Sequence, residues 1–169
     1  AAFDLYILQR RAAELDYTTQ EQIQARKVFD AMDEATKQRL IRNIIAGLPG
    51  AEESFTLEEF NAALEEYREI NAERLRSHLF AFLREIMPVA DECGVRVAIH
   101  PDDPPRPMFG LPRILSNEQD ISLLMNNFSS PNCGLNICAG SLGASAANDL
   151  EKFIRTWGAR IPFVYLRSV

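Results

Sequence analysis

The order of elements predicted in the second half of the sequence constrains the fold more than any other feature. Short β-branched runs lie at residues 95–100, 134–140 and 161–167, and a helical segment separates each run from the next. This order is typical of parallel β/α units, because a helix usually returns the chain to the start of the next parallel strand. We therefore expect an α/β fold with three consecutive parallel strands.

The helices of this second half have recognisable start signals. Ser116 with Gln119, and Asn148 with Glu151, have the spacing of a capping box, in which two side chains satisfy free backbone N–H groups at a helix start. The pattern therefore predicts one helix beginning near Ser116 and a second beginning near Asn148. Gly158 is predicted to end the second helix.

The first half of the sequence has a helical pattern as far as Gly94. Threonine and glutamate three residues apart form capping boxes that predict helix starts near Thr18 and Thr56. A third helix is expected from about Asp33, with residues 47–53 as a connector. No strand is predicted in this half.

A long helix is expected to close the first half. It begins near Asn71, and its apolar residues recur at helical spacing. Pro88 is expected to bend or restart this helix, because proline lacks the backbone N–H that continues the ladder. Gly94 is expected to end it.

Three parallel strands are too few to close a sheet on themselves. An eight-stranded barrel usually needs about 250 residues, whereas the sequence has 169 and stops directly after the third predicted strand. We therefore expect one structural domain, truncated at both ends, that is a piece of a larger β/α protein. Residues 1–94 would form a helical region, and residues 95–169 would form three β/α units.

The charge pattern argues against nucleic acid and membrane partners. The sequence has 18 Lys and Arg against 24 Asp and Glu, a net charge of -6, and no basic run. Its apolar stretches are shorter than the roughly 18 residues of a membrane span, and no cationic leader precedes the first of them. Three cysteines cannot all pair with one another, so reduced thiols and a cytoplasmic location are expected.

Two residues with metal-binding chemistry follow the first two predicted strands. His100 ends the first strand and precedes a proline-rich loop, and Cys138 has the equivalent place on the second strand. Parallel strands lie about 5 Å apart and point the same way, so a thiolate and an imidazole at their ends can share one divalent ion. Alternatively, His100 caps its strand by hydrogen bonding, and Cys138 is a small buried apolar residue.

Further polar residues are expected at the same edge of the sheet. Arg167, near the end of the third strand, could bind a carboxylate with two parallel hydrogen bonds, although a surface ion pair is an equally good interpretation. Asp102 and Asp103 could act as acid, base or supporting residues. The Asp-Asp-Pro-Pro sequence is also typical of a turn.

Specific motifs in the sequence resemble one enzyme family. The segments HPDDPPRPMFGLPRILSNEQD, NICAGSLGASAANDL and ARIPFVYLRS closely resemble mannonate dehydratase, and TKQRLIRNIIAGLPGAEESFTLEEF resembles the helical insertion of that family. The resemblance covers essentially the whole sequence. It implies a partial TIM (β/α)8 barrel of the xylose-isomerase-like group, with a helical insertion in the N-terminal half.

The activity that this resemblance implies is that of a hydro-lyase. Family members remove water from D-mannonate to give 2-keto-3-deoxy-D-gluconate in glucuronate catabolism, with Mn²⁺ or Fe²⁺ as cofactor. A homo-oligomer, most simply a dimer, is also implied. Two alternatives are a non-catalytic interaction module from a truncated gene and a metal-dependent sugar isomerase on a similar barrel.

The resemblance assigns roles to individual residues. His100 and Cys138 match metal ligands of the family, whereas Tyr165 stands where the family pattern has a third ligand, a histidine. A phenol binds a divalent ion only after losing its proton, which a free tyrosine does near pH 10. Ser141 joins Arg167 and Asp102 as an expected substrate-binding residue.

The rest of the expected catalytic machinery lies beyond the C-terminus of this sequence. The family's fourth ligand, an aspartate, and its acid–base histidine belong to a later segment. We therefore expect the 169 residues alone to have little or no activity.

Overall fold

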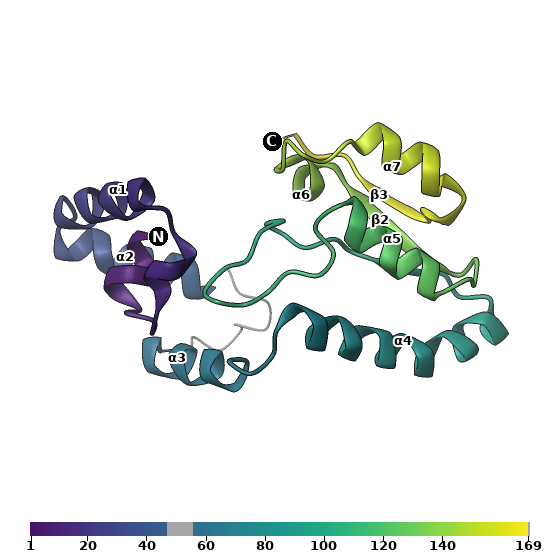
Figure 1. The fold of residues 1–169 in the computed structure, drawn as a ribbon, viewed down its shortest axis with the longest axis horizontal. Helices are drawn as coiled ribbons and strands as arrows, with labels where there is room; N and C mark the ends of the chain where they lie inside the picture. Colours follow the sequence, from purple (N-terminus) through teal and green to yellow (C-terminus); the bar gives the residue numbers. More distant parts are fainter. Residues whose placement is uncertain (47–55, 169) are drawn as a thin grey trace. The chain divides into compact units, whose positions relative to one another are not determined.

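The computed structural model describes residues 1–46 and 56–168 (Figure 1). The predicted connector at residues 47–53 lies outside the described residues. The chain forms two compact units, one of residues 1–69 with 109–111 and the other of residues 70–108 with 112–169. No helix of the described residues is long and apolar enough to cross a membrane.

The described part of the first unit is helical, as the pattern predicts. Its elements are the π-helix η1 (Phe3–Ile7), the 3-10 helix η2 (Ala13–Asp16), α1 (Thr19–Asp30), α2 (Glu34–Ala46) and α3 (Leu57–Glu66). The capping boxes at Thr18 and Thr56 are both confirmed, with each threonine accepting the N–H three residues on and each glutamate bonding back.

A buried ion pair fixes the start of the first unit. The Asp4 side chain is fully buried, and its carboxylate accepts hydrogen bonds from Arg10 Nε at 2.9 Å and Nη2 at 2.8 Å. The Tyr17 hydroxyl donates to the same carboxylate at 2.9 Å. Burial and this bond to Asp4 raise the pKa of Tyr17 to about 12. The unit therefore has a polar cluster beside its apolar core of Phe3, Leu8 and Phe60.

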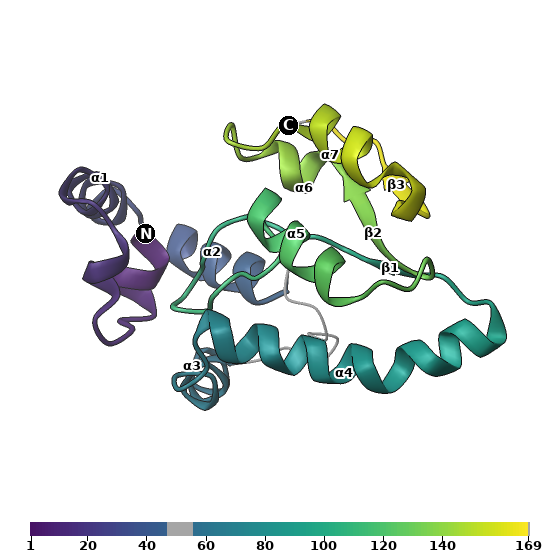
Figure 2. The ribbon, with the colours of Figure 1, turned by 45° about the vertical axis from the view of Figure 1, so that its right-hand side comes forward.

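The second unit begins with the long helix α4 (Ala72–Cys93), which Figure 2 shows as one continuous helix. Asn71 caps its start, and Gly94 ends it with a left-handed φ of 65°, as predicted. The helix does not restart at Pro88. Met87 and Ala90 on either side of Pro88 are buried in the core, so packing maintains the helix across the missing N–H.

The described residues of this unit form a small parallel sheet. The strands β1 (Val97–Ile99), β2 (Cys133–Cys138) and β3 (Phe163–Tyr165) pair in the order β1-β2-β3. The helices α5 (Glu118–Asn127), α6 (Ala139–Gly143) and α7 (Leu150–Trp157), followed by η3 (Gly158–Arg160), lie between the strands in sequence. The expected α/β class and the parallel pairing are confirmed.

Helices cover one face of this sheet. Leu135 and Ile137 of β2 are buried in one cluster with residues of α4, α5 and α7, among them Leu83, Leu124 and Phe153. Side chains alternate along a strand, so Gly134, Asn136 and Cys138 point to the opposite face. These three residues are therefore on the face opposite the one that packs against α4, α5 and α7, and they are buried as well.

Two predicted helix caps are wrong by one residue. The cap of α5 is Asn117, which accepts from Asp120 N at 3.0 Å, and not Ser116. The cap of α7 is Asp149, which accepts from Lys152 N at 3.0 Å, and not Asn148.

The displaced capping residues have other partners. The Ser116 hydroxyl donates to Asp102 Oδ2 at 2.9 Å. The Asn148 amide donates to the carbonyls of Ser116 and Leu142, both at 2.9 Å. These tertiary bonds occupy the side chains that the local pattern assigned to capping.

Gly134 marks a close approach between β2 and the turn before β3. A Cβ at this position would lie 2.5 Å from the Arg160 carbonyl oxygen and 2.7 Å from Pro162 Cδ. The Arg160 guanidinium also donates to the carbonyls of Cys133 and Met125, at 2.8 and 2.9 Å. Glycine at position 134 therefore allows the turn at residues 160–162 to pack directly against the backbone of β2.

Candidate functional site

The predicted site residues lie at the carboxyl ends of the three strands. His100 directly follows β1, while Cys138 and Tyr165 are the last residues of β2 and β3. Cys138 and Tyr165 are partners in the strand register. In parallel β/α folds these strand ends form the edge at which ligands bind. The topology therefore places the three side chains where function is expected.

Cys138 is a buried thiol with polar neighbours. Its side chain is fully buried, and the Ser141 hydroxyl donates to Sγ at 3.1 Å. Burial opposes loss of the thiol proton, but hydrogen bonds from Ser141, His100 and Arg167 lower the pKa of Cys138 to about 7. These hydrogen bonds favour the thiolate, which is the form that binds metals.

His100 is close enough to Cys138 to contribute a hydrogen bond to the thiol. Its ring is exposed and meets the ring of Tyr165 edge to face, with 5.9 Å between centroids. Its Nδ1 lies 2.6 Å from the Pro101 carbonyl oxygen. A carbonyl only accepts, so Nδ1 carries a proton in this contact. The structure thus brings an imidazole and a thiol together.

Arg167 connects the proline-rich loop to the strand ends. Its Nη2 donates to Asp103 Oδ2 at 2.6 Å and to Ser141 Oγ at 3.1 Å. The bond from Arg167 lowers the pKa of the Asp103 carboxyl. The side chain also passes close to Gly140, where a Cβ would lie 2.6 Å from the Arg167 Nε. Sequence reasoning did not anticipate this pairing of Arg167 with Asp103.

Asp102 has a different environment from its neighbour. One carboxylate oxygen, Oδ2, accepts from the N–H groups of Ile114 and Leu115, at 2.8 and 2.6 Å, and from the Ser116 hydroxyl. These bonds fasten the two ends of the 102–116 loop together. They agree with the turn interpretation of this residue, and contact between Asp102 and substrate stays a prediction.

Asn136 is a polar residue at the site that the sequence analysis missed. It lies two residues before Cys138 on β2, only 5% exposed, and its Oδ1 has no hydrogen-bond partner among the described residues. Two positions along a strand share a face. The signal in the sequence is one asparagine within an otherwise apolar strand.

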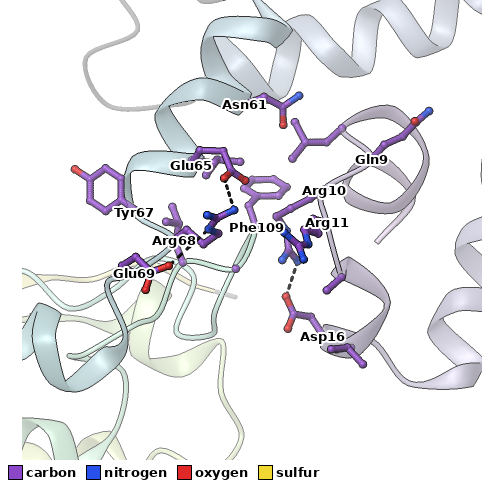
Figure 3. Close-up of a pocket in the computed structure, with 16 residues that line it drawn as sticks. Gln9, Arg10, Arg11, Asp16, Asn61, Glu65, Tyr67, Arg68, Glu69 and Phe109 are labelled. Atoms are coloured by element: carbon purple, nitrogen blue, oxygen red, sulfur yellow. Dashed lines mark hydrogen bonds and ion pairs between the residues drawn. The ribbon is translucent and has the colours of Figure 1, made fainter.

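A separate pocket lies within the first unit (Figure 3). It has a volume of about 870 Å³, and Phe109 and Leu15 contribute apolar surface to its lining. Its charged groups largely neutralise one another, since Arg10 pairs with Asp16, and Arg68 pairs with Glu65. None of its lining residues is one of the predicted site residues.

The described residues contain no group of three or more His, Cys, Asp or Glu side chains placed to hold a metal ion. His100 and Cys138 supply two donors, and the third strand end carries the phenol of Tyr165. Among the described residues, the donors at these strand ends are thus limited to an imidazole, a thiol and a phenol, and metal binding by His100 and Cys138 stays a prediction.

The sequence of the chain is similar to known dehydratases. The family model for D-mannonate dehydratase (UxuA) matches residues 8–169. Curated proteins named mannonate dehydratase are 52% identical in Chromohalobacter salexigens, 49% in Marinomonas sp. and 48% in Saccharophagus degradans. These matches cover 99 to 100% of this chain and 43% of each relative. The chain therefore spans less than half the length of these relatives.

A solved structure supports the same relationship. The crystal structure of mannonate dehydratase from Streptococcus suis serotype 2 superposes with a TM-score of 0.59 at 38% identity, over 61% of this chain and 30% of that protein. The fold and the strand-end site define an α/β protein with a thiol and an imidazole at neighbouring parallel strands. The chain belongs to the D-mannonate dehydratase family.

Proposed function

We propose that the polypeptide to which these residues contribute removes water from D-mannonate to give 2-keto-3-deoxy-D-gluconate. The observation that carries the proposal is the meeting of His100 and Cys138 at adjacent strand ends, in a chain about 50% identical to mannonate dehydratases. The predictions of glucuronate catabolism, a cytoplasmic location and a homodimer belong to the same proposal.

The architecture proposed for the whole protein is a TIM (β/α)8 barrel of which these residues form a part. The parallel order of the three strands and the similarity to the Streptococcus suis enzyme support it. Both side chains of β2 that point away from the helices, Asn136 and Cys138, would then face the barrel interior. Residues 1–94 would then supply the family's helical insertion together with barrel helices.

His100 and Cys138 are proposed as two ligands of a divalent ion, Mn²⁺ or Fe²⁺. The donor chemistry fits: imidazole and thiolate both bind borderline divalent ions, and Cys138 has a pKa of about 7. When bound, the ion supplies Lewis acidity toward the oxygen atoms of a sugar acid. Further ligands would come from outside the described residues.

The chain's own residues have distinct roles in this proposal. The Pro101 carbonyl holds a proton on His100 Nδ1, which leaves Nε2 as the nitrogen that would bind an ion. Arg167 has further guanidinium N–H groups beside the thiol, from which a substrate carboxylate or hydroxyl would accept, while the single Ser141 proton is donated to the Cys138 sulfur. The acid–base group that moves the C2 proton is proposed to lie outside these 169 residues.

The 169 residues alone are proposed to be inactive or nearly so. They span 43% of the relatives' length, and each 1.36 kcal/mol of lost transition-state stabilisation lowers the rate about tenfold. Intact mass spectrometry of the natural protein establishes whether the polypeptide is longer than this sequence.

A chimera tests the function of these residues directly. The 169 residues replace the matching segment of the Chromohalobacter salexigens relative, and formation of 2-keto-3-deoxygluconate from D-mannonate is assayed with added Mn²⁺. We expect measurable activity that His100→Ala and Cys138→Ser each abolish together with bound metal. A folded chimera in which neither substitution changes metal content would contradict the proposal, and isomerised sugar as product would favour the isomerase alternative.

A further inference from the structure

A chain of hydrogen bonds leads from the proline-rich loop to the Cys138 thiol. Asp103 Oδ2 accepts from Arg167 Nη2 at 2.6 Å, and the same nitrogen donates to Ser141 Oγ at 3.1 Å. The Ser141 hydroxyl then donates its proton to Cys138 Sγ at 3.1 Å. A serine hydroxyl has one proton and two lone pairs. It can therefore accept from Arg167 while it donates to sulfur, and each bond fixes the direction of the next.

The inner two residues of this chain of hydrogen bonds are buried. Cys138 and Ser141 are both 0% exposed, and they lie three residues apart at the junction of β2 and α6. Arg167, in contrast, has a half-exposed side chain, as has Asp103. The outer ion pair can therefore be changed with little effect on the core, whereas the bond between Ser141 and Cys138 lies inside it.

The Arg167 side chain occupies space that only glycine leaves open. A Cβ on Gly140 would lie 2.6 Å from Arg167 Nε, 2.9 Å from its Cβ and 3.0 Å from Cζ. All three distances are shorter than a van der Waals contact, so Arg167 would have to move. The absence of a side chain at position 140 thus permits the guanidinium to reach Ser141.

We infer that Ser141 and Arg167 are positioning residues that hold the Cys138 thiol in one orientation, with Gly140 admitting the arginine. The role rests on the proposed function insofar as Cys138 binds a metal, but the orientation of the thiol can be measured without metal. It differs from the substrate-binding role expected for the same two residues, in which their donors would face a bound sugar acid.

The metal-free test measures the side-chain rotamer of Cys138. Three-bond couplings between its Hα and Hβ protons are recorded in cysteine-labelled 169-residue protein for four variants. Ser141→Ala removes the donor to sulfur, Arg167→Met removes the outer donor, and Gly140→Ala retains every hydrogen-bonding group while displacing Arg167. Arg155→Met is the matched control, because Arg155 also forms an exposed ion pair at 2.6 Å, with the Glu151 carboxylate.

We expect a single rotamer in the unsubstituted protein and in Arg155→Met, and averaged couplings in the other three variants. Couplings that stay unchanged in Ser141→Ala and Gly140→Ala, with circular dichroism showing both folded, would overturn the inference. Averaging in Ser141→Ala alone would overturn the part assigned to Arg167 and Gly140.

A second measurement relates the orientation to metal binding. Co²⁺ is titrated and its thiolate charge-transfer absorbance is followed. Residues that orient a ligand typically change metal affinity about 10- to 100-fold, and we expect a loss of that size in Ser141→Ala, Arg167→Met and Gly140→Ala. If the unsubstituted protein gives no thiolate absorbance, the proposed metal site fails, and the couplings still decide the positioning role.

Discussion

Cys138 and Tyr165 are direct partners in the parallel ladder of β2 and β3, and the Tyr165 ring meets that of His100 edge to face. A side chain at position 165 therefore lies next to both proposed metal donors. It is also the position at which this chain departs from the expected histidine.

Tyr165→Phe and Tyr165→His test this relationship. Histidine would add a neutral imidazole donor without a proton to remove, so we expect Co²⁺ to bind at least about tenfold more tightly than to the unsubstituted protein. Phenylalanine should give no gain. Titration of the thiolate absorbance measures both variants. Equal affinity for the two would show that position 165 does not reach the ion, and neither variant is expected to make the 169 residues an active dehydratase.

Gly134→Ala is expected to destabilise the second unit. The added methyl would lie 2.5 Å from the Arg160 carbonyl oxygen, a backbone atom that cannot rotate away. Overpacking of this kind costs about 1 to 3 kcal/mol. Urea unfolding followed by the fluorescence of Trp157 measures the loss. Gly158→Ala is the matched control, since a Cβ there meets nothing within 4 Å, and its unfolding midpoint should change little.

Tyr17→Phe is expected to change how the stability of the first unit depends on pH. The pKa of Tyr17 is raised from 10 to about 12 by burial and by Asp4. The unfolded chain therefore loses the phenol proton first, so stability is full below pH 10 and falls as pH rises through about 12. Phenylalanine removes this dependence, and losing the hydrogen bond costs about 1 kcal/mol at neutral pH.

Urea unfolding followed by circular dichroism at pH 9 and pH 11.5 compares Tyr17→Phe with the unsubstituted protein. The difference in unfolding free energy between the two proteins should shrink at the higher pH. If this difference in unfolding free energy were the same at both pH values, the raised pKa of Tyr17 would be contradicted. Tyr67→Phe serves as control, because Tyr67 is half exposed.

Asp102→Ala is expected to release the 102–116 loop. Two backbone N–H groups, those of Ile114 and Leu115, would lose their acceptor, at a cost of about 2 to 4 kcal/mol. Asp103→Ala removes an adjacent but exposed carboxylate, and a much smaller loss is expected. Hydrogen exchange of the Leu115 amide reports on the loop. Unchanged protection in Asp102→Ala would contradict the structural role of this residue.

Local sequence patterns predicted the elements well where neighbouring residues determine them. Thr18 and Thr56 cap their helices as expected because both partners of each box lie within one helical turn. The boxes at Ser116 and Asn148 failed because those side chains bond to residues 14 and 32 positions away. Nothing within a turn of either residue reveals such a partner.

The site was predictable to the extent that topology determines it. Parallel pairing in the order β1-β2-β3 puts the carboxyl ends of all three strands at one edge of the sheet, so strand order predicted that His100 and Cys138 share that edge. The register sets the last residue of β1, Ile99, opposite Leu135, which spacing in the sequence does not reveal. The contact between Arg167 and Asp103 spans 64 positions. This contact depends on the path of the proline-rich loop, which cannot be predicted from the spacing of residues in the sequence.

The close approach of Gly140 to Arg167 has a consequence for how the family can vary. A side chain at position 140 and a long side chain at position 167 cannot occupy the same volume, so the two positions should change together across homologues. Members with alanine or serine at 140 should have a shorter residue at 167, and members that retain arginine there should retain glycine. A constraint on the residue at position 167, just after β3, would thus also restrict the residue at position 140 of the short helix α6, 27 residues earlier in the sequence.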